Sequence, residues 1–288
     1  MKGKKNNYLT SCLLVIAFLA GLSLLLYPTV SNYINSKHQS RTLAAYSDDV
    51  SRLSETEYAE IMEAARAYNN AMGKNVAHIL SMAEQQEYYR QLNIGKNGIM
   101  GQIDIPTIDV SLPIYHGTDA TVLQIAVGHL DWTSLPVGGE SSHCVLSGHR
   151  GLPSAKLFTH LDKLVVGDTF MLRVLDEVLT YEVDQIAIVK PSEINQLCIV
   201  EGEDLCTLVT CTPYGINTHR LLVRGHRIEN AVADVRVVSE AIVIDPLIVA
   251  PIVAFPFLFL LLMMVMLKKP EKKIKLDDIR TVEKGEQT

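Results

Sequence analysis

Residues 204–225 read DLCTLVTCTPYGINTHRLLVRG: a β-branched and apolar run, a short segment of turn-forming residues, and a second apolar run. This order predicts two strands joined by a loop, because Pro, Gly and Asn favour turns whereas Val, Leu and Thr suit a pleated surface. Cys211 ends the first predicted strand and Arg220 begins the second. A thiol and a guanidinium are therefore expected together at the mouth of one loop.

A histidine stands at the end of another predicted strand, upstream of that pair. Residues 145–151 read VLSGHRG, so His149 follows a short apolar run and is itself followed by a glycine two positions later. Acyl transfer through a thioester needs a thiolate, a proton donor for the leaving amine and a fixed donor for the oxyanion. The three strand ends offer a side chain for each of these tasks.

These runs resemble the sortases, the membrane-anchored cysteine transpeptidases of Gram-positive bacteria, whose signature is a distant His, then Thr-Leu-x-Thr-Cys, then Arg. The signature reads TLVTC at residues 207–211, and the match extends over GHRGLPSAKLF at 148–158 and TCTPYGINTHRLLVRG at 210–225. The resemblance spans roughly residues 98–228 and is to the pilus-building class C sortases in particular. It implies a mainly β fold built on a closed β-barrel.

The resemblance also implies a role for each site residue. Cys211 is expected to hold the acyl group as a thioester, and His149 to protonate the leaving amine and later deprotonate the incoming one. Arg220 keeps its proton, so it is expected to hold the substrate carbonyl or the oxyanion. The Thr210 hydroxyl, or a backbone N–H beside Cys211, is expected to add to that oxyanion site. No cofactor and no metal are expected.

The expected substrate is a Leu-Pro-x-Thr-Gly sorting signal on a secreted pilin, cut between Thr and Gly and joined to a lysine of the next pilin. The partners are thus pilin subunits and the cytoplasmic membrane, and the net charge of −6 gives no reason to expect nucleic acid. The alternatives are a housekeeping sortase that anchors proteins to the cell wall, a Cys–His hydrolase and a non-catalytic tethered binding module. A papain-like hydrolase would place its cysteine before its histidine, the reverse of the order here.

Two apolar segments, residues 9–27 and 246–267, are expected to cross the membrane. Each is about long enough for a hydrocarbon core of about 30 Å, and the mean hydropathy of +0.17 agrees. A signal peptide is the alternative for the first segment, but no small-x-small cleavage site follows it. Lysines lie between each span and the nearer end of the chain: Lys2, Lys4, Lys5, Lys268, Lys269, Lys272, Lys273 and Lys275. Because positive charge favours the cytoplasmic side, both termini are expected in the cytoplasm and the catalytic domain outside.

The chain between the spans divides into a helical part and a strand part. A capping box at Ser54 and Glu57 predicts a helix that ends at Gly73, and a second helix is expected over residues 76–92. After Met100 apolar residues alternate with period two, and Pro106 and Pro113 are expected at strand ends or edges. The expected organisation is a cytoplasmic terminus (1–8), a span (9–27), an extracellular helical flank (28–97), the catalytic barrel (98–230), a linker (231–245), a second span (246–267) and a charged cytoplasmic tail (268–288).

The remaining cysteines are expected to be structural. Cys144 should be buried in a strand, and a disulfide between Cys198 and Cys206 stays open because spacing alone does not set its geometry. A zinc site built on His143 and Cys144 is disfavoured, since the chain has no Cys-x-x-Cys pair.

One departure from the class C pattern concerns the lid over the active site. Many class C sortases carry there a loop with Asp-Pro followed by an aromatic residue. The corresponding residues 73–87 read GKNVAHILSMAEQQE and contain no Asp-Pro pair. The lid is therefore expected to be absent or rebuilt, and Cys211 to be open to solvent.

Overall fold

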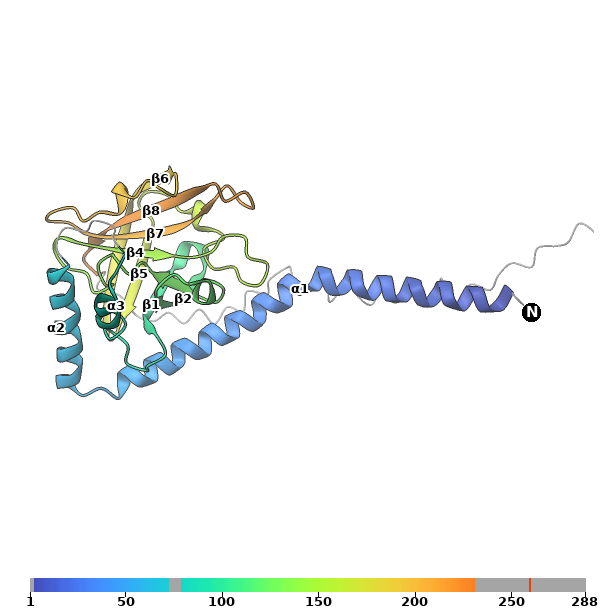
Figure 1. Ribbon diagram of the computed structural model, residues 1–288, viewed down its shortest axis with the longest axis horizontal. Coiled ribbons are helices and arrows are strands. Elements are labelled where there is room, and N and C mark those ends of the chain that lie inside the picture. The colour runs from blue at the N-terminus through green and yellow to red at the C-terminus, as the bar shows by residue number, and fades with distance from the viewer. Residues whose placement is uncertain (1–2, 73–78, 231–258, 260–288) are drawn as a thin grey trace, which may run out of the picture. The chain divides into compact units, whose positions relative to one another are not determined.

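Eight strands close into one barrel in the order β1-β2-β3-β4-β7-β8-β6-β5 (Figure 1). The computed structural model describes residues 3–72, 79–230 and 259. The strands are β1 (Ile99–Ile105), β2 (Val110–His116), β3 (Val127–His129), β4 (Ser142–Ser147), β5 (Thr169–Val174), β6 (Glu177–Val189), β7 (Asp204–Thr212) and β8 (His219–Ile228). The helices are α1 (Gly3–Ser51), α2 (Glu55–Ala71), α3 (Met82–Tyr88) and α4 (Ala120–Leu123), with 3-10 turns η1 (Pro106–Ile108), η2 (Leu161–Lys163) and η3 (Asn195–Leu197). The predicted mainly β fold, with a closed barrel after an N-terminal helical region, is confirmed.

Helix α1 runs without a break from the first expected span into the expected helical flank, and it contains Pro28. Within the described residues, one helical segment, Leu13–Ser51, is long and apolar enough to cross a membrane. Its most apolar stretch has a mean hydropathy of 2.3. The second expected span, residues 246–267, lies outside the described residues apart from Phe259. A pair of transmembrane helices therefore stays a prediction.

The C-terminal half of α1 belongs to the same compact unit as the barrel, which includes the described residues from Tyr27 onward up to residue 230. Asn35 donates from Nδ2 to the carbonyl of Ser154 at 2.7 Å, and the Asn32 Oδ1 accepts from the backbone N–H of Lys156 at 2.9 Å. Farther along, the buried Tyr46 packs in the barrel core. Two of these contacts reach the loop between β4 and β5, so this half of α1 supports that loop.

Helices α2 and α3 both begin with a capping box. Ser54 caps α2 as predicted. Ser81 and Glu84 form a second box that starts α3, and Leu92, with φ at +55°, has left the helical conformation. Among the described residues, the helix predicted over residues 76–92 is thus shorter than predicted and covers Met82–Tyr88. The Ser-x-x-Glu pattern at residue 81 is the sequence signal that marks its true start.

Pro113 lies inside β2 rather than at a strand end. It stands opposite Gln102 of β1, whereas the pairing of β2 with β3 starts only at Ile114. At Pro113, β2 therefore pairs with β1 alone. Proline has no backbone N–H to donate, and on the side of β2 that faces away from β1 no hydrogen bond is lost at this position. Pro113 thus lies at a local edge of the sheet, as expected, although the barrel as a whole is closed.

The two faces of β7 pack against different clusters of side chains. Cys206 and Leu208 belong to the main barrel core. Val209 belongs to a smaller outer cluster with Val145, Val189, Leu197 and Leu222, in which the connection between β6 and β7 covers the sheet. Because side chains alternate along a strand, Cys211 lies on the outer face with Val209.

Candidate active site

Strands β4, β7 and β8 lie side by side and bring the three predicted residues to one end of the barrel. Strand β4 runs parallel to β7, with Ser147 opposite Val209, and His149 follows two residues after Ser147. Strand β8 runs antiparallel to β7 and places Arg220 directly opposite Cys211. The ends of β4 and β7 and the start of β8 thus share one edge of the sheet, although the histidine and the cysteine are far apart in the sequence.

Cys211 lies on the outer face of β7 and is not part of the buried core. Cys211, Arg220 and His149 are all partly exposed. Cross-strand neighbours such as Cys211 and Arg220 have Cβ atoms about 5 Å apart.

The residue before His149 is tied to β7. The backbone N–H of Gly148 donates to the Val209 carbonyl at 3.0 Å, and the Thr210 hydroxyl donates to the Gly148 carbonyl at 2.7 Å. Thr210 is buried and its hydroxyl proton is used in this bond. The Thr210 hydroxyl therefore lies on the inner face of β7, opposite to the face of Cys211, and ties β7 to Gly148.

The loop carrying His149 is shaped by close packing on Phe158. A Cβ at Gly148 would stand 2.7 Å from a ring carbon of Phe158, which is fully buried. The Phe158 N–H donates to the His149 carbonyl at 3.1 Å. Glycine at 148 therefore lets the chain pass the ring and hold the histidine backbone against it.

Arg220 keeps most of its donors available. Its Nη1 donates to the carbonyls of Asn217 at 3.3 Å and His219 at 3.1 Å, which fixes the guanidinium over the loop between β7 and β8. Within the part of the chain that the structure describes, Arg220 forms no salt bridge. Its charge is thus free to face a developing oxyanion.

The other described cysteines do not reach the site. Cys144 and Cys206 are buried opposite each other across β4 and β7. Burial raises the pKa of the Cys206 thiol well above its ordinary value. Cys198 and Cys206 are both free, so the disulfide that the sequence left open does not form in this structure. Cys211 is the described cysteine placed beside the arginine and the histidine loop.

Both ring nitrogens of His143 have hydrogen-bond partners within the fold. Its Nδ1 lies 2.8 Å from the Cys198 carbonyl and its Nε2 lies 2.7 Å from the Thr207 hydroxyl. Burial lowers the pKa of His143, so the ring is neutral at pH 7. Among residues 3–72, 79–230 and 259, no group of three His, Cys, Asp or Glu side chains could hold a metal ion.

The segment in the place of the class C lid is described only from residue 79 onward. Leu80 is buried in the barrel core cluster, whereas Ile79 beside it is exposed. Residues 73–78 lie outside the described part. With the described residues in place, Cys211 is partly exposed.

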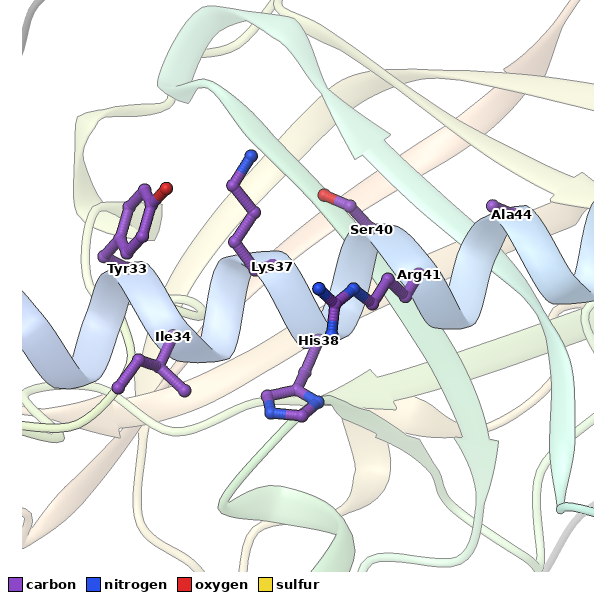
Figure 2. Close-up of a pocket in the computed structure, with 7 residues that line it drawn as sticks. All are labelled: Tyr33, Ile34, Lys37, His38, Ser40, Arg41 and Ala44. Atoms are coloured by element: carbon purple, nitrogen blue, oxygen red, sulfur yellow. The ribbon is translucent and has the colours of Figure 1, made fainter.

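A groove of about 610 Å³ runs along α1 and does not involve these residues (Figure 2). The Nζ of Lys37 lies 5.7 Å from the centroid of the Tyr33 ring. The described residues that line the groove are Tyr33, Ile34, Lys37, His38, Ser40, Arg41 and Ala44. We therefore give it no part in the reaction.

Comparison with known proteins matches both the sequence and the fold. Residues 103–228 match the family model for the sortase domain. The crystal structure of sortase C1 from Streptococcus agalactiae is 51% identical with a TM-score of 0.64, over 66% of this chain and 100% of that chain. Sortase C-1 from Streptococcus pneumoniae is 46% identical with a TM-score of 0.61, over 66% of this chain and 100% of that chain.

A curated relative, sortase A from Streptococcus agalactiae, is 25% identical over 220 residues, which are 74% of this chain and 84% of that protein. The similarity to sortase C1 is closer and extends over the whole of its solved chain. The barrel, the strand ends and this similarity agree, and the chain belongs to the sortase family of cysteine transpeptidases, with class C sortases as its structural neighbours.

Proposed function

We propose that this sortase polymerises pilins and that Cys211, His149 and Arg220 carry out the reaction. The observation that supports it best is the cross-strand pair of Cys211 and Arg220 beside the loop of His149. One of the similar structures, sortase C1 of GBS pilus island 1, is 44% identical. The substrate in this proposal is a Leu-Pro-x-Thr-Gly signal on a secreted pilin.

The first half of the proposed reaction forms a thioester. The Cys211 thiolate attacks the carbonyl carbon of the signal's threonine, and the Arg220 guanidinium donates hydrogen bonds to the oxyanion that forms. When this intermediate collapses, the bond to the glycine nitrogen breaks. Protonated His149 gives its proton to that nitrogen, so the glycine leaves as a neutral amine.

The second half transfers the acyl group to a lysine of another pilin. The lysine amine attacks the thioester carbon while neutral His149 takes its proton. The carbon–sulfur bond then breaks, which leaves an isopeptide bond and restores the Cys211 thiolate. A hydrolase would use water at this step, so the acceptor distinguishes the two functions.

Trapping the acyl-enzyme tests this proposal. Full-length protein from cells should carry, on Cys211, an acyl group that ends in threonine, and mass spectrometry of its peptides would identify the bound pilin. The Cys211→Ala protein is the control and should carry no such group. An adduct on another residue, or pilin released only as a free acid, would contradict the transpeptidase mechanism.

We also propose a two-pass membrane topology with the barrel outside the cell. In it residues 9–27 and 246–267 are the spans, residues 28–97, 98–230 and 231–245 form the external flank, barrel and linker, and residues 1–8 and 268–288 are cytoplasmic. The apolar helix within Leu13–Ser51 and the lysines beyond each span support it.

Protease protection checks this topology. A protease added to intact protoplasts should digest the barrel and leave an epitope tag placed after Thr288 intact, because the C-terminus lies in the cytoplasm in this topology. Lysed protoplasts are the control and should lose the tag as well. Loss of the tag from intact protoplasts would place the C-terminus outside.

A further inference from the structure

We infer that Arg150 is a positioning residue, which holds the loop of His149 against the end of the strand that carries Cys211. The inference rests on the proposed function, since it assigns Arg150 a task in placing two residues of that site. Arg150 follows His149 directly in the chain. Its side chain is only 10% exposed.

The Arg150 guanidinium joins three segments that meet at the site. Its Nη1 donates to the hydroxyl of Thr212, the residue after Cys211, at 3.2 Å. Its Nη2 donates to Asp162 at 2.6 Å, in η2 on the far side of the loop. Its Cζ lies 6.0 Å from the ring centroid of Tyr214, in the loop between β7 and β8. Arg150 thus connects the loop of His149 to the end of β7.

The contact with Thr212 completes a pair of cross-links around His149. On the other side, the Thr210 hydroxyl holds the carbonyl of the residue before the histidine, at 2.7 Å. Both threonines are buried on the inner face of β7, and Cys211 between them points to the outer face. The two cross-links therefore set the register of residue 149 against residue 211.

The geometry of the guanidinium, rather than its charge alone, makes these contacts. The ammonium of lysine could meet Asp162 or Thr212, but it lacks the rigid planar fork that spans both. The Arg150 Nε is buried and has no hydrogen-bond partner among the described residues. A buried unpaired donor is unfavourable. The contacts that tie the loop to β7 and to η2 are therefore made by the two Nη atoms.

The test measures turnover by the full-length protein in detergent, with a fluorophore–quencher peptide carrying Leu-Pro-Glu-Thr-Gly as the probe. Arg150→Ala should lower kcat by about 10-fold to 100-fold, because a displacement of about 1 Å can slow a reaction about 100-fold. KM should stay within about twofold, since Arg150 does not contact substrate in this inference. Arg150→Lys should not restore kcat.

Added guanidinium separates positioning from general stability. Guanidinium chloride at a non-denaturing concentration should raise the kcat of Arg150→Ala, because the ion can occupy the place of the missing group. A protein that is only destabilised would gain nothing. Thr212→Val removes the hydrogen bond from Arg150 and conserves the volume of the side chain, so it should also lower kcat. It provides a second test if Arg150→Ala does not fold.

Arg173→Ala is the matched control. Arg173 makes a partly buried ion pair with Asp104 at 2.7 Å, on strands β5 and β1. This variant should keep the wild-type kcat. Wild-type kcat in both Arg150→Ala and Thr212→Val, with Cys211→Ala inactive, would overturn the inference and leave the proposed function intact. Turnover by Cys211→Ala would instead overturn the proposed function.

Discussion

Replacing Cys211 with alanine should abolish the covalent pilin ladders that the proposed activity would produce. Without a thiol beside Arg220 the thioester cannot form, and the described cysteines at positions 144, 198 and 206 lie elsewhere in the barrel and its loops. The measurement is an immunoblot of cell-wall extracts for high-molecular-weight pilin. The expected signal is below detection.

The other cysteines provide controls on the same barrel. Cys144→Ala, Cys198→Ala and Cys206→Ala should each keep the ladders. The changes at Cys144 and Cys206 should lower the melting temperature slightly, because both thiols are buried in the core. Normal ladders in the Cys211→Ala strain would remove Cys211 from the mechanism.

Changing His149 or Arg220 should lower kcat/KM by a factor of about 100 or more, which corresponds to about 2.7 kcal/mol of lost transition-state stabilisation. His149→Ala removes the proton donor for the leaving amine, and Arg220→Ala removes the donor for the oxyanion. Arg220→Lys should fail to restore activity, because an ammonium does not reproduce the planar fork. Turnover of the quenched peptide measures all three.

Arg224 offers a matched control for the arginine change. It lies on β8 four residues after Arg220, on the same face, and pairs with Asp184 through Nε at 3.0 Å and Nη2 at 2.9 Å. Arg224→Lys should stay within about twofold of the wild-type kcat/KM. Near-wild-type turnover in His149→Ala or in Arg220→Ala would exclude that residue from catalysis.

The strands could be predicted from the sequence because alternation is a local signal, whereas their closure into a barrel was expected only from the resemblance to sortases. Phe170, Leu172 and Val174 show the inward positions of β5, and the Ser54 capping box shows where α2 begins. The continuity of α1 could not be predicted in this way. Hydropathy marks where an apolar segment ends, whereas the helix continues because residues such as Asn35 and Tyr46 pack on the barrel.

The site could be predicted only in part, for a similar reason. The resemblance named His149, Cys211 and Arg220, but nothing local in the sequence fixes the parallel register of β4 on β7. The cross-links made by Thr210 and Arg150 depend on that register. These contacts join segments far apart in the chain, so their existence follows from tertiary structure alone.

The pairing of β4 with β7 also bears on how the protein folds. The bond between Thr210 and Gly148 closes a loop of 62 residues, within which β5 and β6 must form their own hairpin. Such non-local pairing is slow, because the entropy of loop closure is lost before the contacts form. Until this pairing forms, Cys211 and His149 lie on separate parts of the chain, so the candidate site is assembled only when the barrel closes.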